Sequence, residues 1–228
     1  TGVFVSLDFV LFFIFWELEL LPMYFLISIW GSGRKEYSAM KFLIFTLLGS
    51  AFMLVAILAL YFSTGTFNIV ELQSMSDGAQ LILPAGVIFT FLFVAFAVKL
   101  PVWPVHTWLP DAHTDAPTAV SVMLAGVLLK MGGYGMIRMA VGMFPSRAQE
   151  YAWVLAVIAI ISVIYGAVVT VRQTDLKRLI AFSSISHMGY VLLGISSVVG
   201  VGGTVSSVGL TGAAMQMFTH GTITGLLF

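Results

Sequence analysis

The chain contains no cysteine in its 228 residues. Without thiols it forms no disulfide bond, and it holds neither a thiolate-bound zinc ion nor a cysteine-ligated iron–sulfur cluster. The sequence also lacks a nucleotide-binding glycine loop, a redox motif and any arrangement of a nucleophile with a general base. We therefore expect this chain to carry no cofactor, no metal ion and no redox centre of its own.

Charged residues are also scarce. They make up 9% of the chain, whereas 60% of the residues are hydrophobic, and an ordinary soluble domain carries about 25% charged residues. A soluble fold with this surface would precipitate, so the composition indicates a protein embedded in a membrane. The formal net charge is zero, which argues against nucleic acid as a partner.

Long apolar runs follow one another along the whole chain. A bilayer span needs about 20 apolar residues, and we count runs at roughly 6–30, 38–62, 82–100, 117–140, 151–171, 178–199 and 208–228. The third run continues as a shorter apolar piece to about residue 110 but is interrupted by Pro101, Pro104 and Pro110, which lack backbone donors. We predict an all-α, polytopic transmembrane bundle of about seven spans, one of them discontinuous. Both ends of the chain are apolar or uncharged, so we expect an internal part of a longer protein.

The connections between the runs differ in charge. The loops after the first and fifth runs carry the basic residues Arg34, Lys35, Arg172, Lys177 and Arg178. The loop after the second run has Glu71 and Asp77 and no basic residue. Positive loops face the cytoplasm in most membrane proteins, so we expect the two basic loops to be cytoplasmic.

Ionisable residues inside the apolar runs carry the functional information, because a charge at the bilayer centre costs about 2.5–3.5 kcal/mol on insertion scales. The first run contains Glu17 and Glu19. Residues two apart on a helix point about 200° from each other, so at most one of them faces a given interior path. Either carboxyl could also serve only as a hydrogen-bonding group between helices.

Two lysines lie in or beside the apolar runs. Lys99 ends the third run, just before the break at Pro101, and such broken helices often form ion sites in transporters; alternatively, Lys99 could extend its ammonium to the membrane surface. Lys130 lies about 13 residues into the fourth run, near the bilayer centre. From there a lysine side chain is too short to bring its ammonium to the membrane surface. Glycines at 126, 132, 133 and 135 would allow another helix to approach it closely.

Histidines occur in two later runs and in the interrupted segment. His187 and His220 each lie in a polar stripe at helical spacing, and histidine can pass a proton between its two ring nitrogens. His106 and His113 belong to the interrupted segment. Each histidine could instead be a neutral hydrogen-bonding group. The grouping of Asp111, His113 and Asp115 suggests a metal site, but we interpret these aspartates as helix-starting groups.

Three stretches resemble a known family: FWELELLPMYFLISIWG (15–31), AVKLPVWPVHTWLPDAHTDAPTAVSVMLAGVLLKMGGYG (97–135) and TDLKRLIAFSSISHMGY (174–190), with weaker agreement in QMFTHGTITGLLF (216–228). Together they resemble the antiporter-like, proton-pumping membrane subunits of respiratory complex I (NADH:quinone oxidoreductase), above all the M-type or chain 4 subunits. Related subunits occur in multisubunit cation/proton antiporters.

The resemblance implies a role for each candidate residue. Glu17 matches the family glutamate that pairs with the lysine of the broken helix, here Lys99. Lys130 matches the central lysine of the proton relay. His187 and His220 match positions on the central hydrophilic axis, and His106 and His113 fall near the helix break. The resemblance assigns no role to Glu19.

The resemblance also implies an architecture and a setting. The family has two inverted repeats, of which residues 1–140 would hold most of the first and residues 151–228 the start of the second. The implied function is proton translocation, coupled to electron transfer elsewhere in a complex, beside other membrane subunits in a bacterial cytoplasmic membrane. Two alternatives stay open: a subunit of a cation/proton antiporter driven by ion gradients, and a structural membrane scaffold.

Overall fold

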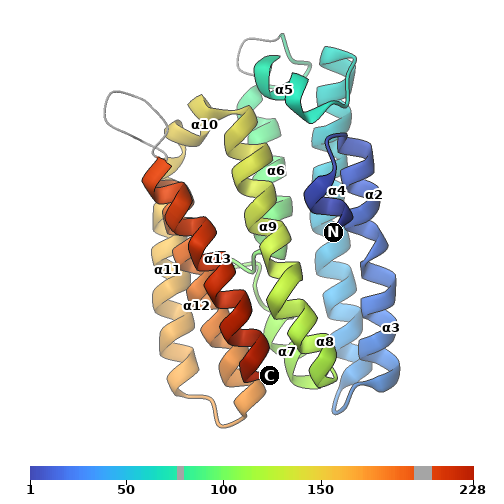
Figure 1. The fold of residues 1–228 in the computed structure, drawn as a ribbon, viewed down its shortest axis with the longest axis vertical. Helices are drawn as coiled ribbons and strands as arrows, with labels where there is room; N and C mark the ends of the chain where they lie inside the picture. Colours follow the sequence, from blue (N-terminus) through green and yellow to red (C-terminus); the bar gives the residue numbers. More distant parts are fainter. Residues whose placement is uncertain (76–79, 198–206) are drawn as a thin grey trace.

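The computed structural model describes residues 1–75, 80–197 and 207–228, so Asp77 of the acidic loop lies outside the described residues. Long helices run side by side along one axis and form an elongated bundle (Figure 1). Extended structure in the described residues is limited to one bridge between Asp8 and Asn68. The predicted all-α bundle is confirmed.

The first third of the chain forms one interrupted column and one long helix, with short helices at their ends. These elements are α1 (Gly2–Val5), α2 (Phe9–Leu18), α3 (Leu20–Trp30), α4 (Lys35–Thr64) and α5 (Ile69–Met75). Asp8 caps α2 by accepting hydrogen bonds from the backbone N–H groups of Val10 and Leu11, both at 2.9 Å. The column is interrupted at Glu19 because the ring of Pro22 clashes with the carbonyl four residues earlier and offers it no N–H.

The middle of the chain contains the discontinuous helix. Its halves are α6 (Ala85–Lys99) and α7 (Trp108–Asp115), separated by the non-helical residues 100–107. The next column consists of α8 (Thr118–Met123), the π-helical segment η1 (Leu124–Leu128), α9 (Leu129–Gly135) and a second π-helical segment, η2 (Met136–Val141). The short helix α10 (Pro145–Glu150) follows. The break therefore falls where the proline pattern predicts it.

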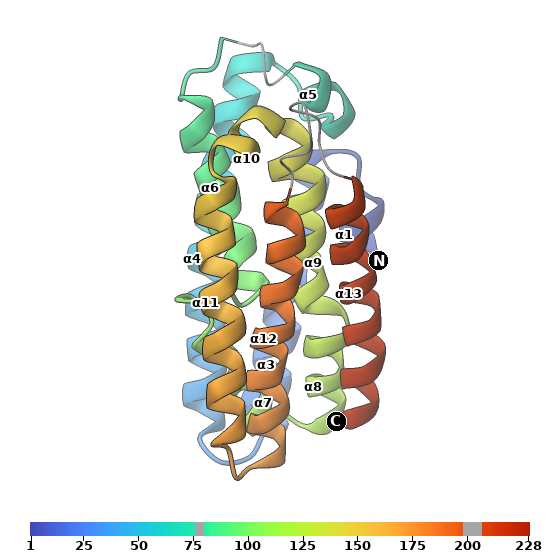
Figure 2. The same ribbon diagram turned by 90° about the vertical axis from the view of Figure 1, so that its left-hand side faces the viewer.

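The last third contributes three long helices that pack on one side of the bundle: α11 (Ala152–Val171), α12 (Leu176–Ser196) and α13 (Ser207–Leu227). Figure 2 shows α11, α12 and α13 side by side, with α13 lying along the α8–α9 column. This packing brings the histidines of α12 and α13 close to the lysine of α9.

Five helices in the described residues are long and apolar enough to cross a membrane: Phe9–Trp30, Lys35–Thr64, Thr118–Val141, Ala152–Val171 and Leu176–Ser196. α6 is apolar but shorter, and α13 has 21 residues. Large apolar side chains point outward from the bundle, such as Trp153 at 70% and Val168 at 63% exposed. Such a surface suits lipid better than water.

The two basic connections lie at the same end of the bundle. The α3–α4 and α11–α12 connections are at the lower end of Figure 1, and α5 and α10 are at the upper end. The two connections that the sequence groups on one side of the membrane therefore lie on one side of the bundle.

Candidate functional site: buried lysines and histidines

Lys99 is the last residue of α6 and is only 1% exposed. Its ammonium forms an ion pair with Glu19, at the junction of α2 and α3. The same Nζ lies 5.2 Å from the centre of the Trp16 ring and 5.9 Å from that of Phe42, where the electron-rich ring faces attract a cation. Lys99 is thus held inside the bundle by a carboxylate and two aromatic rings, and it does not extend to the surface.

The ion pair corrects one expectation from the sequence. The resemblance implied Glu17 as the partner of Lys99, but the structure places Glu19 there. Glu19 lies at the junction of α2 and α3, one turn before Pro22. Glu17 lies beside the Ser50 hydroxyl of α4 and within electrostatic range of Lys99. Both acids therefore face the same cation, but only Glu19 contacts it.

The break after Lys99 leaves backbone groups that need partners in an apolar environment. The indole Nε1 of Trp108 donates to the carbonyl of Val98 at 2.9 Å. The backbone N–H of Trp103 donates to Oγ of Ser162, on α11, at 3.0 Å. Side chains thus replace two of the hydrogen bonds that an uninterrupted helix would supply.

Close packing brings the α9 backbone against the end of α6, where the break begins. A Cβ added at Gly132 would lie 2.7 Å from the backbone nitrogen of Leu100 and 2.8 Å from the carbonyl oxygen of Phe96. A Cβ at Gly135 would overlap the Phe96 ring. The two glycines therefore let the α9 backbone touch the end of α6, as the glycine pattern predicts.

Lys130 itself is 8% exposed and lies directly after the π-helical segment η1. Its Nζ donates to the backbone carbonyl of Ala125, and it lies 2.6 Å from Nδ1 of His220. A Cβ at Gly221 would lie 3.4 Å from Cε of Lys130, so this glycine keeps α13 close. The central lysine and a histidine of another helix are thus in direct hydrogen-bonding contact.

The polar stripes of α12 and α13 continue from this contact. The ring centres of His220 and His187 are 5.6 Å apart, and Nε2 of Gln216 lies 3.0 Å from Nδ1 of His187. Both histidines line a cavity of about 190 Å³ between α12 and α13, together with Ser183, Gln216 and Thr219. Lys130, His220, His187 and Gln216 form a connected polar array, which we call the lysine–histidine array.

The two histidines of the discontinuous helix lie apart from one another. His113, on α7, is fully buried, and its ring stacks on that of Phe228 with 4.8 Å between centres. It lies within electrostatic range of Lys130, so it borders the lysine–histidine array. His106 lies in the non-helical residues, where its ring packs edge-on against Tyr165 of α11 at 4.9 Å. The structure therefore associates His113, but not His106, with the other candidates.

A second cavity lies beside Glu19. It measures about 390 Å³, is mostly apolar and lies between the α1–α3 segment and the α8–α9 column. Glu19 is its one ionisable side chain, and Leu128 and Met131 form part of its wall. The cavity thus reaches the carboxylate of the Lys99 ion pair.

The structure corrects the interpretation of Asp111 and Asp115 as helix-starting groups. Asp111 lies within the first turn of α7 and Asp115 is its last residue, and the residue before α8 is Pro117. Asp111 instead pairs with Lys41 of α4 at 2.7 Å, a contact that sequence reasoning missed. Among the described residues, no group of three or more His, Asp or Glu side chains could hold a metal ion.

Comparisons with known proteins identify the family of the chain. Residues 6–228 match the family described as "NADH:quinone oxidoreductase/Mrp antiporter, TM". The chain is 47% identical to NADH-quinone oxidoreductase subunit M of Rhodobacter capsulatus, aligned over the whole chain and 45% of that protein. It is 48% identical to NAD(P)H-quinone oxidoreductase chain 4 of Gloeobacter violaceus, over the whole chain and 42% of that protein. The chain thus spans less than half the length of these curated relatives.

Solved structures show the same likeness. A chain of respiratory complex I from Thermus thermophilus with bound NADH superposes with a TM-score of 0.88 at 30% identity, over 99% of this chain and 47% of that one. A chain of the Mrp complex from Dietzia sp. superposes with a TM-score of 0.84 at 27% identity, over 98% of this chain and 41% of that one. The match of sequence and fold over almost the whole chain shows that it belongs to the transmembrane subunit family shared by NADH:quinone oxidoreductases and Mrp antiporters.

Proposed function

We propose that this chain is part of a proton-translocating membrane subunit of an NADH:quinone oxidoreductase, or of a related complex with another electron donor. The observation that carries this proposal is the buried contact between Lys130 and His220. Ionisable residues buried inside membrane-spanning helices are rare, and they usually mark a transport pathway. In this proposal the chain moves protons and has no redox centre, and electron transfer takes place in other subunits.

The geometry supports a defined proton step. The Lys130 ammonium can donate a proton to Nδ1 of His220, which leaves a neutral amine and an imidazolium ion. His220 then releases a proton from Nε2, and the imidazole of His187, which lines the same cavity, is the next acceptor. Each transfer occurs between groups in contact or across one small cavity, as a relay requires.

In this proposal the Lys99–Glu19 ion pair controls the loss of the proton from Lys130. Two opposite unit charges about 4 Å apart attract by about 4 kcal/mol at an effective dielectric constant near 20. Moving Glu19 away from Lys99 would leave the Lys99 charge uncompensated beside the α9 backbone. The resulting field would favour loss of the proton from Lys130 toward the histidines. Glu17, also within range of Lys99, would limit this effect.

The wider setting is also part of the proposal. Residues 1–140 would form most of the first inverted repeat and residues 151–228 the start of the second. The partners would be neighbouring antiporter-like subunits in a bacterial cytoplasmic membrane. The basic end of the bundle would face the cytoplasm. The bacterial sources of the similar subunits support this setting.

One observation favours an alternative, a subunit of a cation/proton antiporter: the superposition on a chain of the Mrp complex. That function would be driven by an ion gradient and would not need electron transfer. The family match includes both classes, and the higher identity to the quinone oxidoreductase subunits favours the first. A purely structural scaffold would tolerate neutral residues at Lys99 and Lys130.

The proposal is tested with Lys130→Ala in the full-length protein, assembled in its complex in inverted membrane vesicles. We expect NADH-driven electron transfer to a quinone to continue and the accompanying proton uptake to fall sharply. The matched control is Arg147→Ala, which removes an exposed cation from the opposite end of the bundle from the basic loops. Normal proton uptake by Lys130→Ala would exclude the relay. Proton movement driven by a sodium gradient without NADH would favour the antiporter.

A further inference from the structure

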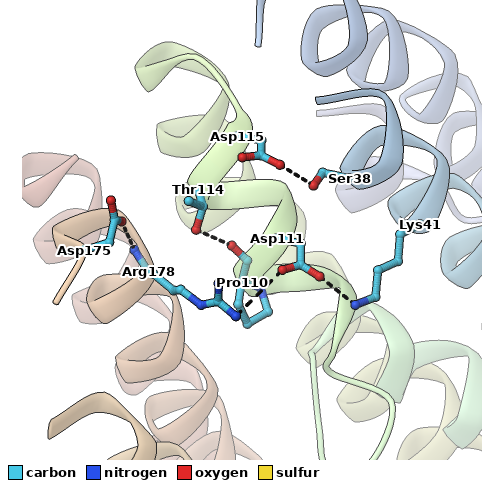
Figure 3. Close-up of polar contacts among 8 residues, drawn as sticks. All are labelled: Ser38, Lys41, Pro110, Asp111, Thr114, Asp115, Asp175 and Arg178. Carbon is cyan, nitrogen blue, oxygen red and sulfur yellow. Dashed lines mark hydrogen bonds and ion pairs between the residues drawn. The ribbon is translucent and has the colours of Figure 1, made fainter. Parts of the chain in front are cut away.

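Asp111 contacts cations from two different helices. It lies in the first turn of α7, and its side chain is 13% exposed. Its Oδ2 accepts from Nζ of Lys41, on α4, at 2.7 Å, and its Oδ1 lies 4.0 Å from a guanidinium nitrogen of Arg178, on α12 (Figure 3). One carboxylate therefore connects α4, α7 and α12.

The other end of α7 is held by the same neighbours. Oγ of Ser38 donates to Oδ2 of Asp115 at 2.5 Å, and the backbone N–H of Ser32 donates to the Asp115 carbonyl at 2.8 Å. Nζ of Lys177 donates to the carbonyl of Ala116 at 2.8 Å. Figure 3 shows Ser38 and Lys41 facing α7 from one side, with Arg178 on the other.

These lateral contacts matter because α7 is not continuous with α6. An unbroken helix fixes the position of its second half through its own hydrogen bonds. Here residues 100–107 are non-helical, so the position of α7 depends on the side chains around it. Isolated ion pairs at a surface contribute little to stability, whereas partly buried pairs joined in a network contribute more. The Lys41 side chain is only 20% exposed.

We propose that Asp111 is a positioning residue that holds the second half of the discontinuous helix between α4 and α12. Each of the three connected helices carries a group of the candidate site. Phe42, next to Lys41, packs over the Lys99 ammonium. α12 carries His187, and α7 carries the buried His113. Asp111 touches none of the relay groups, and it acts by keeping these three helices in register. The effect on transport rests on the proposed function, but the effect on α7 does not.

The test uses the full-length protein in its assembled complex, in inverted vesicles. Residues 1–228 contain no cysteine, so Ala112→Cys places one thiol in this part of the protein, at a fully buried position of α7, and its labelling is measured on the peptide that contains residue 112. In this background Asp111→Asn removes the charge with little change in shape, and Asp111→Glu keeps the charge. The matched control is Glu150→Gln, which removes an acid from an exposed ion pair at the opposite end.

We expect Asp111→Asn to raise the rate at which a membrane-permeant maleimide labels the introduced thiol by about fivefold, the scale of one partly exposed ion pair. Protons taken up per electron should fall by a similar factor. Asp111→Glu should restore both values, and Glu150→Gln should change neither. If Asp111→Asn does not accumulate, Lys41→Met and Arg178→Met provide the same measurement, with the larger effect from Lys41.

The outcomes separate the two proposals. Unchanged labelling of the introduced thiol in Asp111→Asn overturns the positioning role. Increased labelling with unchanged proton uptake overturns the link from α7 to the relay. Increased labelling in Asp111→Asn, combined with normal pumping by Lys130→Ala, would show that Asp111 positions α7 and that the proposed function is wrong.

Discussion

Lys99 pairs with Glu19, although Glu17 is on the same helical column and within electrostatic range of the same ammonium. Glu19 contacts the ammonium, whereas Glu17 lies beside the Ser50 hydroxyl. A buried cation with one contacting and one distant carboxylate has a second partner available when the first is removed. The substitutions of the two glutamates should therefore differ in their effects.

We predict that Glu19→Gln destabilises the assembled complex more than Glu17→Gln. Breaking a buried ion pair costs roughly 3–5 kcal/mol. We expect about 2 kcal/mol here, because the Glu19 side chain is 18% exposed and Glu17 partly compensates. The midpoint of heat-induced aggregation of the purified complex in detergent measures the difference. A larger drop for Glu17→Gln would show that Glu17 is the main partner.

His220→Phe should interrupt the lysine–histidine array, because it removes the nitrogen that contacts Lys130. Losing a group that transfers protons typically slows the step about a hundredfold or more. We expect proton uptake per electron to collapse while the complex still assembles. Tyr190→Phe is the control, since Tyr190 is half exposed on α12 and only its hydroxyl is lost. Full proton uptake by His220→Phe would contradict the relay through α13.

Gly132→Ala should be harmful, because the new methyl group would meet backbone atoms of residues 96 and 100. Overpacking of this kind costs about 1–3 kcal/mol, more than alanine gains over glycine in a helix, about 1 kcal/mol. Gly212→Ala is the matched control, because nothing lies within 4 Å of its added Cβ. We expect the thermal midpoint to fall for Gly132→Ala and to stay equal or rise for Gly212→Ala. The reverse order would contradict close contact between α9 and α6.

Trp108→Phe keeps an aromatic ring in the core but removes the indole N–H that satisfies the Val98 carbonyl. A buried carbonyl left without a donor costs about 1–3 kcal/mol. Trp153→Phe changes a side chain that is 70% exposed, and its effect should stay within about 0.5 kcal/mol. Thermal stability of the two variants, measured side by side, checks the role of Trp108 at the break. Equal stabilities would mean that the carbonyl has another partner.

The sequence alone predicts the features that depend on local chemistry. Pro101 and Pro104 lack backbone donors, so a break after Lys99 follows from covalent structure. The position of Lys130 within an apolar run indicates its burial, and nearby glycines indicate a close helix contact. The structure shows all three features.

Other features depend on relations between distant segments, which spacing along the chain does not reveal. The choice between Glu17 and Glu19 depends on how the interrupted helix turns toward α6. The contact of Lys130 with His220 depends on the register of α13 against α9. The Asp111 contacts require α4 and α12 to lie on either side of α7 at the same end of the bundle. The basic residues near that end were visible in the sequence, but they did not indicate which acid they would meet.

The position of Lys99 at the end of α6 has an electrical consequence. The aligned peptide dipoles of a helix place roughly half a negative charge at its carboxyl end. Lys99 is the last residue of α6, so its ammonium lies where that charge is concentrated. A cation in such a place gains up to about 2 kcal/mol when partly buried. In an unbroken helix Lys99 would lie in the middle, where the dipoles of neighbouring turns cancel. The prolines after Lys99 therefore give the lysine a source of negative potential that no substitution of a carboxylate would remove.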